Sequence, residues 1–223
     1  MIKVENIYTY NLARAIYSAR NPLNSWNKSD SDLEKDIIGK NDLDLMKRLY
    51  KAGTEHRKYL RQIFVSMDIT APLYWWKEFD TYKVGTVANS CSTMHKIHAK
   101  EFDIDDFSNE HLTDETVNAY YKQGEYNCCL SGISAYDWIN ETTAVLNAYR
   151  EKYLETKDKK YWWQMIQLLP SSYNQKRTVT MNYENVVTII KQRTGHKLDE
   201  WREFIEILKD LPYILEITEE SGC

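Results

Sequence analysis

The polar residues best suited to chemistry lie late in the chain, in the segment LLPSSYNQKRTVTMNYENVVTIIKQRTGHKLDEWREF. Asn182 stands where strand-like alternation changes to helical spacing, and its amide can cap a helix or hold the polar edge of a ring. Arg193 lies at the end of the same predicted helix, where its forked donors suit a phosphate or a pyrimidine carbonyl. The structural alternatives are an ordinary cap and a cation that complements the helix C-terminus. Either residue taken alone is compatible with both interpretations.

Helices dominate the elements that must position these two residues. Apolar spacing predicts helices at 12–19, 42–51, 114–121, 134–154, 160–168, 182–193 and 197–209, and strands at 61–69 and 176–181. Thr70 is expected to cap a further helix with Pro72 in its first turn. The few strands predict an α/β (α+β) fold with helices around a small, mostly antiparallel sheet. Because no Pro- or Ser-rich linker interrupts the chain, we expect a single domain over residues 1–223.

Composition excludes several classes of partner. The net charge of −4 gives no general attraction to DNA, RNA or an anionic membrane, so an anionic ligand needs a local basic site. No apolar run reaches the ~20 residues of a membrane span, and the N-terminal residues lack a signal-peptide layout, so a cytoplasmic location is expected. His95 and His98 have a spacing that can bind a metal, but solvated histidines are the commoner outcome, and we expect no metal site.

The same late segment resembles the C-terminal signature of the flavin-dependent thymidylate synthase family. That signature has a Leu-Pro pair, a Tyr, a Thr-rich strand, an Asn that opens a helix, an Arg eleven residues later, and a His…Glu…Arg helix start. The matching residues here are Leu169, Pro170, Tyr173, Thr178, Thr180, Asn182, Arg193, His196, Glu200 and Arg202. The spacing from Pro170 through Arg193 needs no gap, and the stretch from His196 to Arg202 is one residue shorter than usual.

The resemblance implies a set of site residues. It assigns Asn182 to the flavin and Arg193 to the deoxyuridylate substrate. Fainter correspondences add further candidates for the cofactor, namely His56, Asn89 and Thr188, and for the substrate, namely Lys83, Ser90 and Ser92. No catalytic side chain is assigned, because in this family the flavin carries the redox chemistry.

The chain departs from the family in its diagnostic motif. The stretch WWKEFDTYKVGTVANSCSTMHKIH stands where the family has R-H-R-x-x-S-x-N-x-x-S-x-R-Y, and it contains neither the Arg-His-Arg triplet nor the closing Arg-Tyr. Two further family arginines are replaced by Ile166 and Glu184. Lost cations weaken the binding of a dianionic nucleotide, because each phosphate contact is charge-assisted.

The resemblance therefore implies a divergent member of the family. Its expected activity is methylation of deoxyuridylate with methylene-tetrahydrofolate and reduced FAD, with NADPH as reductant, in a homotetramer. The alternative is a nucleotide- or flavin-binding homologue that has lost thymidylate synthesis.

Overall fold

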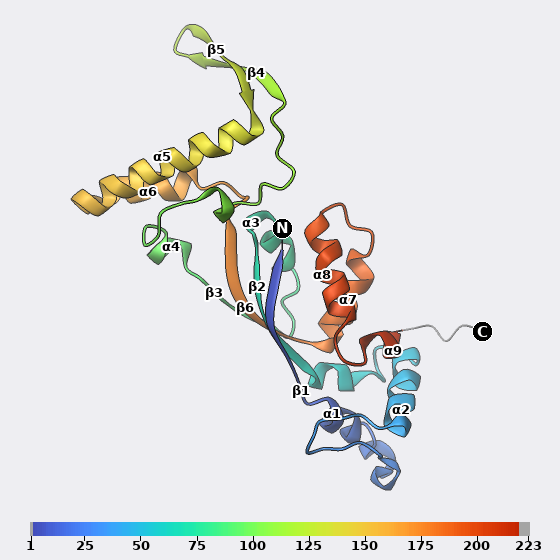
Figure 1. Ribbon diagram of the computed structural model, residues 1–223. Coiled ribbons are helices and arrows are strands. Elements are labelled where there is room, and N and C mark those ends of the chain that lie inside the picture. Colours follow the sequence, from blue (N-terminus) through green and yellow to red (C-terminus); the bar gives the residue numbers. More distant parts are fainter. Residues whose placement is uncertain (1, 219–223) are drawn as a thin grey trace. The chain divides into compact units, whose positions relative to one another are not determined.

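The computed structural model describes residues 2–218, which form two compact units (Figure 1). The sheet unit contains residues 2–70, 78–90 and 176–218, and the helical unit contains residues 71–77 and 91–175. The assignment of residues 1–223 to one domain stays a prediction.

A four-stranded sheet is the centre of the sheet unit. Its strands follow the order β1 (Lys3–Tyr10), β2 (Phe64–Pro72), β6 (Asn174–Asn182) and β3 (Thr86–Ser90). β1 pairs antiparallel with β2, and β3 pairs antiparallel with β6. Alternation along β2 buries Val65, Met67 and Ile69, which confirms the strand predicted at 61–69. Strands β1 and β3 were not predicted from the sequence.

Five helices belong to the sheet unit among the described residues. They are α1 (Leu12–Ser18), α2 (Lys40–Lys51), α7 (Tyr183–Arg193), α8 (Asp199–Lys209) and α9 (Ile214–Thr218), and the short 3-10 helices η1 (Asn21–Leu23), η2 (Trp26–Lys28) and η3 (Lys58–Gln62) connect them. The predicted apolar stripe of α8 is confirmed, because Trp201, Phe204 and Leu208 are fully buried.

The predicted cap at Thr70 is wrong. β2 continues through Pro72, and α3 (Leu73–Phe79) begins only after it. The backbone N–H of Leu73 donates to the carbonyl oxygen of Tyr173, 3.0 Å away, and that of Tyr74 donates to Ser171, also at 3.0 Å. Because backbone acceptors from a distant segment satisfy the first turn, the helix needs no side-chain cap from Thr70.

The helical unit is built on two packed helices, α5 (Ala135–Thr156) and α6 (Lys159–Leu168). Ser134 caps α5 in a reciprocal pair of hydrogen bonds with Asp137, and Lys157 ends the helix with a left-handed backbone. The unit also contains the short helices α4 (Thr93–Lys96) and η4 (Ile104–Asp106). Its small core consists of Ile97, Phe102, Phe107, Ile139, Leu146 and Met165.

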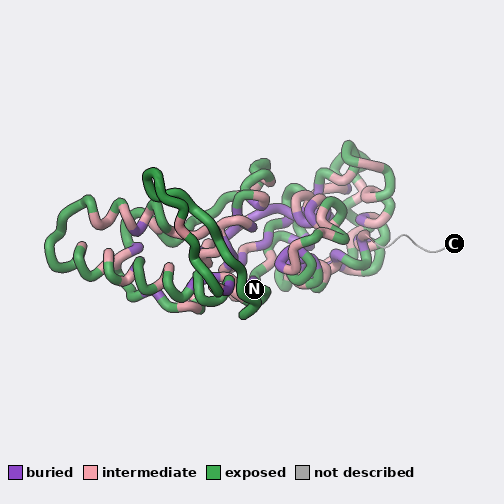
Figure 2. The backbone as a smooth tube through the Cα atoms, turned by 90° about the horizontal axis from the view of Figure 1, so that it is seen from above, coloured by how far each residue is buried: buried purple, intermediate pink, exposed green. Residues whose placement is uncertain are grey.

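A β-hairpin replaces the helix predicted at 114–121. β4 (Thr116–Gln123) and β5 (Tyr126–Ser134) pair antiparallel and are exposed along almost their whole length (Figure 2). Gly124 turns the chain with a φ of 62°, a backbone conformation that hairpin turns require. The β-branched and aromatic side chains of residues 116–121 favour a strand once residues 126–134 are available as a partner. Helical spacing within a single segment could not reveal that partner.

The predicted α+β fold class is confirmed, since the described residues combine helices with small antiparallel sheets.

Candidate functional site

Asn182 lies at the start of α7, directly against the turn before β3. Its Oδ1 accepts a hydrogen bond from the backbone N–H of Asn185 at 3.0 Å, so the predicted helix cap is confirmed. Its own backbone N–H donates to the carbonyl oxygen of Gly85 at 3.2 Å. Gly85 has a φ of 74°, and a Cβ there would lie 2.2 Å from Asn182 Nδ2, so no other residue fits at this position. Within the described residues Nδ2 has no acceptor, and it remains a donor that a ligand can use.

Asn185 fastens the same turn to α7, a role that sequence reasoning missed. Its Nδ2 donates to the carbonyl oxygen of Val84 at 2.6 Å and to Thr86 Oγ1 at 2.7 Å. An asparagine three residues into a helix is a poor helix former, and that mismatch was the signal available in the sequence.

Arg193, at the other end of α7, is held by side chains of the preceding segment. Its Nη1 donates to Glu78 Oε2 at 2.6 Å, and its Nε donates to the hydroxyl of Tyr82 at 2.9 Å. Its guanidinium carbon lies 4.6 Å from the centre of the Trp201 ring. His196 adds a further polar contact, with Nε2 at 3.3 Å from Glu78 Oε2. Arg193 Nη2 has no partner among residues 2–218, so part of the fork is available to a ligand.

The segment from Glu78 to Thr86 therefore runs along α7 from Arg193 to Asn182. A pocket of about 340 Å³, which we call the Lys83 pocket, opens on it and is lined by Phe79, Asp80, Tyr82, Lys83, Thr86 and Ala88. The amine of Lys83 forms no ion pair with a described residue, whereas Asp80 pairs with Arg177 at 2.8 Å. This segment stands where the family carries its Arg-His-Arg motif, and it offers one unpaired lysine at the pocket.

The remaining predicted residues lie in several places. Asn89 and Ser90 are exposed on β3, in register with Thr178 and Arg177. Thr188 donates its hydroxyl to the carbonyl oxygen of Glu184 at 2.7 Å, within α7. The structure thus brings Lys83, Arg193 and Asn182 to one segment of the sheet unit, with Asn89 and Ser90 on the strand that follows.

Two predicted residues lie outside that segment. Ser92 belongs to the helical unit, where its hydroxyl caps α4 by accepting from the backbone N–H of His95 at 3.0 Å. His56 is exposed before η3 and lines a separate pocket of the sheet unit.

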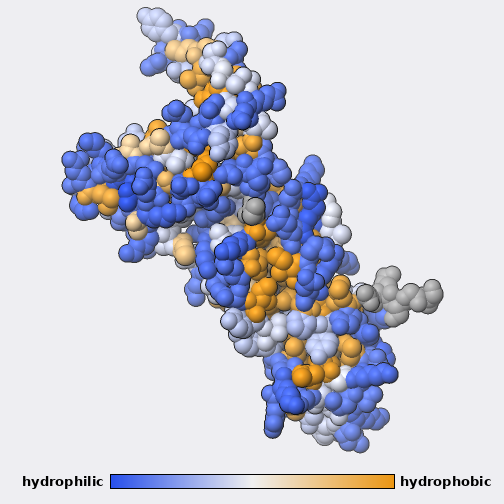
Figure 3. Space-filling view, in the orientation of Figure 1, coloured by the Kyte–Doolittle hydropathy of each residue, from blue (hydrophilic) through white to orange (hydrophobic). Residues whose placement is uncertain are grey.

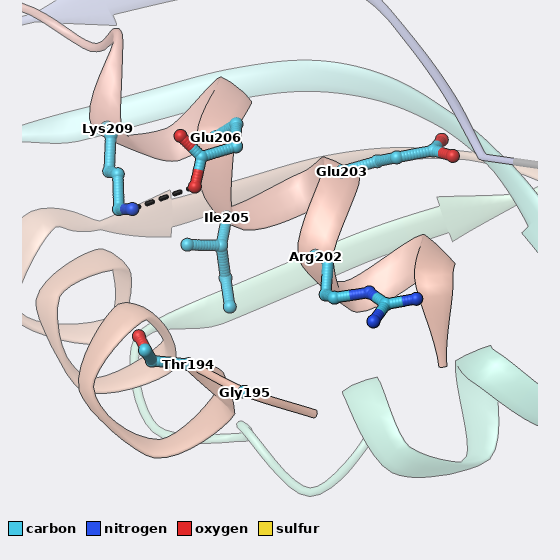
Figure 4. A pocket seen from close by; sticks show the side chains of 7 residues that line it. All are labelled: Thr194, Gly195, Arg202, Glu203, Ile205, Glu206 and Lys209. Carbon is cyan, nitrogen blue, oxygen red and sulfur yellow. Dashed lines mark hydrogen bonds and ion pairs between the residues drawn. The ribbon is translucent and has the colours of Figure 1, made fainter. Parts of the chain in front are cut away.

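A further pocket, between the end of α7 and α8, has two cations in its lining, and both are already paired with carboxylates (Figure 4). Lys209 Nζ lies 2.7 Å from Glu206 Oε1, and Arg202 pairs with Asp199. Arg202, which contributes to the family resemblance, is therefore part of a surface ion pair. Glu203 also lines this pocket, and its carboxylate would repel a phosphate, so the pocket does not suit a phosphate ligand.

Residues 2–218 contain no group of three or more His, Cys, Asp or Glu side chains placed to hold a metal ion. No helix in that range is both long enough and apolar enough to cross a membrane.

The fold is that of flavin-dependent thymidylate synthases. The flavin-dependent thymidylate synthase ThyX from Helicobacter pylori, complexed with FAD and dUMP, matches with a TM-score of 0.66 and 16% identity over 96% of this chain and 98% of that one. A second structure of that enzyme with FAD and dUMP matches with a TM-score of 0.65 and 15% identity over 98% of both chains. The UMP/dUMP methylase PolB from Streptomyces cacaoi, bound with 5-Br dUMP, matches with a TM-score of 0.58 and 15% identity over 94% of this chain and 88% of that one.

These likenesses confirm the predicted resemblance at the level of the fold. No protein-family model and no curated protein sequence matches the chain.

Proposed function

We propose that this protein binds a uridine nucleotide together with FAD and methylates the nucleotide in the manner of a flavin-dependent thymidylate synthase. The single observation that carries the proposal is Asn182 Nδ2 at the Gly85 turn, a donor without an acceptor among residues 2–218, in a fold that matches proteins solved with FAD and dUMP over almost the whole chain. The proposed co-substrates are methylene-tetrahydrofolate and NADPH. Reduced FAD, when bound, supplies the hydride that completes the methyl group.

The residues along α7 fit such ligands in part. Asn182 Nδ2 is a free donor for a ring carbonyl, and Lys83 supplies one positive charge for a phosphate. Arg193 adds its unpaired Nη2, while its bond to Glu78 fixes the direction of the guanidinium. Five further residues stay proposed ligand contacts, with less support than these three: Asn89, Ser90, Ser92, Thr188 and His56.

One observation favours the second candidate, a nucleotide- or flavin-binding homologue that has lost thymidylate synthesis. Glu78 and Asp80 neutralise Arg193 and Arg177, so two cations near the Lys83 pocket are already paired within the protein. Fewer free cations weaken the hold on a phosphate dianion.

A flavin titration followed by an activity assay separates the two candidates. Binding of FAD and of dUMP, together with tritium release from labelled deoxyuridylate, supports the enzyme. Binding without tritium release supports the second candidate. Absence of binding for both ligands contradicts both.

Asn182→Asp tests the proposed ligand contact apart from the cap. Aspartate caps helices as well as asparagine does, so we expect the free energy of unfolding to stay within about 0.5 kcal/mol of the wild type. The aspartate side chain has no N–H to donate, so the affinity for the ligand that Asn182 contacts should fall about tenfold. Calorimetric titrations with FAD and with dUMP measure this loss. Asn140→Asp, on the exposed surface of α5, controls for the added charge. Unchanged affinity for both ligands leaves Asn182 a helix cap only.

Arg193→Lys tests the second contact. Lysine keeps a cation near Glu78 but lacks the Nη2 donor and the hydrogen bond to Tyr82, so we expect about a tenfold loss of dUMP affinity and about 1 kcal/mol of stability. Arg177→Lys is the matched control, because it weakens the ion pair with Asp80 on the same segment. If Arg193→Lys, Arg177→Lys and the wild type bind dUMP with equal affinity, then Arg193 has a structural role alone.

Three wider features complete the proposal: a homotetrameric assembly, a cytoplasmic location and a single functional domain over residues 1–223.

A further inference from the structure

One face of the β4–β5 hairpin is apolar and exposed. Val117 lies opposite Ile133 and Ala119 lies opposite Leu130, so each pair shares a face, and all four side chains line one groove. We call it the hairpin groove. Val117 and Leu130 are 59% and 39% exposed. A two-stranded sheet with such a face is only marginally stable in water unless another surface covers it.

The first turns of α5 supply the other wall of the hairpin groove. Ala135 and Trp138, one turn apart, complete a space of about 550 Å³. Trp138 is 57% exposed, and Val145, two turns further along on the same side of α5, is exposed as well. Figure 3 shows apolar residues gathered on the hairpin between hydrophilic ones, at the upper end of the view. A continuous exposed apolar surface of this kind marks a site of interaction.

Hydrogen bonds within the helical unit hold the groove in a fixed shape. Asn118, at the irregularity in the strand ladder, accepts from the backbone N–H of Gly132 at 3.1 Å and from the hydroxyl of Ser131 at 3.0 Å. Ser134, where the hairpin joins α5, accepts from the backbone N–H of Asp137 at 2.9 Å and donates its hydroxyl to that carboxylate at 2.7 Å. A groove fixed in this way loses little entropy when a partner binds.

Acidic side chains surround the groove. Glu115 lies in its lining, and Glu141 follows one turn after Trp138 on the same side of α5. Neither glutamate forms an ion pair with a described residue. The stretch 112–145 contains five acids and a single cation, Lys122. Such an excess of negative charge repels nucleic acids and anionic lipids and attracts a basic partner.

The same charges disfavour a second copy of this chain as the occupant. In a two-fold contact between two copies, the acids of one groove would face those of the other and repel them. The cations beside the exposed Trp163 on α6 are already engaged within the chain. Lys160 pairs with Asp158 at 3.1 Å, and the amine of Lys159 lies 5.7 Å from the centre of the Trp163 ring. Charge complementarity therefore favours a different protein that carries unpaired cations.

We propose that the hairpin groove binds a basic amphipathic helix of a partner protein. The apolar side chains of that helix pack against Val117, Leu130 and Trp138, and its Lys or Arg side chains pair with Glu115 and Glu141. The groove lies on the face of the hairpin and not at a strand edge, so side chains make the contact, which suits a helix better than an added strand. All of these residues are distinct from those of the proposed reaction.

Fluorescence anisotropy with a labelled peptide of Leu and Lys tests the proposal. The peptide has about 14 residues, with leucines at helical spacing and lysines elsewhere, and a second peptide carries Glu in place of each Lys. We expect the wild type to bind the lysine peptide at least about tenfold more tightly than the glutamate peptide, and less tightly as the salt concentration rises. Equal affinity for the two peptides overturns the proposal, as does absence of binding at millimolar peptide.

Trp138→Ser removes the largest apolar side chain of the groove at an exposed position. It should weaken binding of the lysine peptide at least about tenfold, because a central aromatic side chain supplies much of the energy of such a contact. Trp163→Ser, also exposed and in the same unit, is the matched control and should bind within about twofold of the wild type. Urea denaturation checks that both variants are folded. Equal affinity in Trp138→Ser and the wild type contradicts the proposed site.

The double variant Glu115→Gln, Glu141→Gln tests the acidic rim without touching the apolar walls. We expect it to bind the lysine peptide about fivefold more weakly. Glu151→Gln with Glu155→Gln removes the same charge from exposed positions near the other end of α5 and should bind within about twofold of the wild type. Equal losses in the two double variants would show a general attraction to an acidic protein and would overturn the assignment to the groove.

Sedimentation velocity separates a partner protein from a second copy. We expect the wild type and Trp138→Ser to have the same oligomeric state. A lower oligomeric state in the variant would assign the groove to a contact between copies and overturn the proposal. None of these measurements uses flavin or a nucleotide, so their outcome is independent of the proposed function.

Discussion

Arg20→Met is expected to lower the free energy of unfolding by about 3–5 kcal/mol, because it leaves a buried carboxylate without its cation. Arg20 is 6% exposed and Asp42 is fully buried, with Arg20 Nε 2.7 Å from Asp42 Oδ1. Methionine fills a similar volume, so the loss reports on the missing charge rather than on a cavity. Urea denaturation of the wild type and the variant measures the difference.

A partly exposed pair provides the control. Arg57 and Glu184 lie 2.8 Å apart with side chains 20% and 16% exposed, so Arg57→Met should cost about 1–2 kcal/mol. A loss below about 1.5 kcal/mol in Arg20→Met would mean that Ser29 and Ser31 alone can stabilise the buried carboxylate.

The pH dependence of stability gives a second readout of the same pair. Burial acts to raise the pKa of Asp42, but hydrogen bonds from Ser29, Ser31 and Arg20 outweigh it and hold that pKa below the usual value. A lowered pKa contributes stability above the unfolded value of about 3.9, and this contribution is lost as the pH falls through the folded value. Without Arg20 the pKa of Asp42 rises toward its unfolded value, so the part of the acid-induced loss of stability that Asp42 causes should be smaller in the variant and should end at a higher pH.

Trp201→Ala is expected to cost about 3–5 kcal/mol, the range for removing a fully buried large aromatic side chain. The Trp201 ring is completely buried and packs against Phe79 and Phe204, with ring centres 6.4 and 6.1 Å away. Its Nε1 donates to Glu78 Oε2 at 3.0 Å, and its face lies under Arg193. The variant therefore loses core packing together with the support of Glu78 and Arg193, and dUMP binding should weaken as well.

Trp163→Ala controls for the loss of an indole. Trp163 is 42% exposed on α6, in the helical unit, and its removal should cost about 1 kcal/mol or less. Thermal or urea unfolding of both variants measures the two losses. A Trp201→Ala variant as stable as Trp163→Ala would contradict the assignment of Trp201 to the core beneath Arg193.

The sequence by itself determined the elements whose signals are local. The apolar spacing of α2, α5, α6, α7 and α8 and the alternation of β2 each depend on side chains within a few residues, and these predictions are confirmed. The cap role of Asn182 is equally local, because the backbone N–H that donates to its side chain belongs to Asn185, three residues away. The family resemblance, and with it the fold, was also present in the sequence between Leu169 and Arg202.

Only the tertiary structure decided which segments pair. The hairpin of β4 and β5 and the start of α3 depend on hydrogen bonds to residues that local spacing does not identify. These are the positions where the predicted helix and cap were wrong.

The state of each charge was likewise decided by the tertiary structure. Arg193 and Glu78 are 115 positions apart, and nothing in either local sequence shows that their charges meet. Arg20 and Asp42 are 22 positions apart, and only folding buries one charge against the other. Electrostatic energy depends on the distance between charges in space, so the availability of a cation for a ligand is a property of the fold.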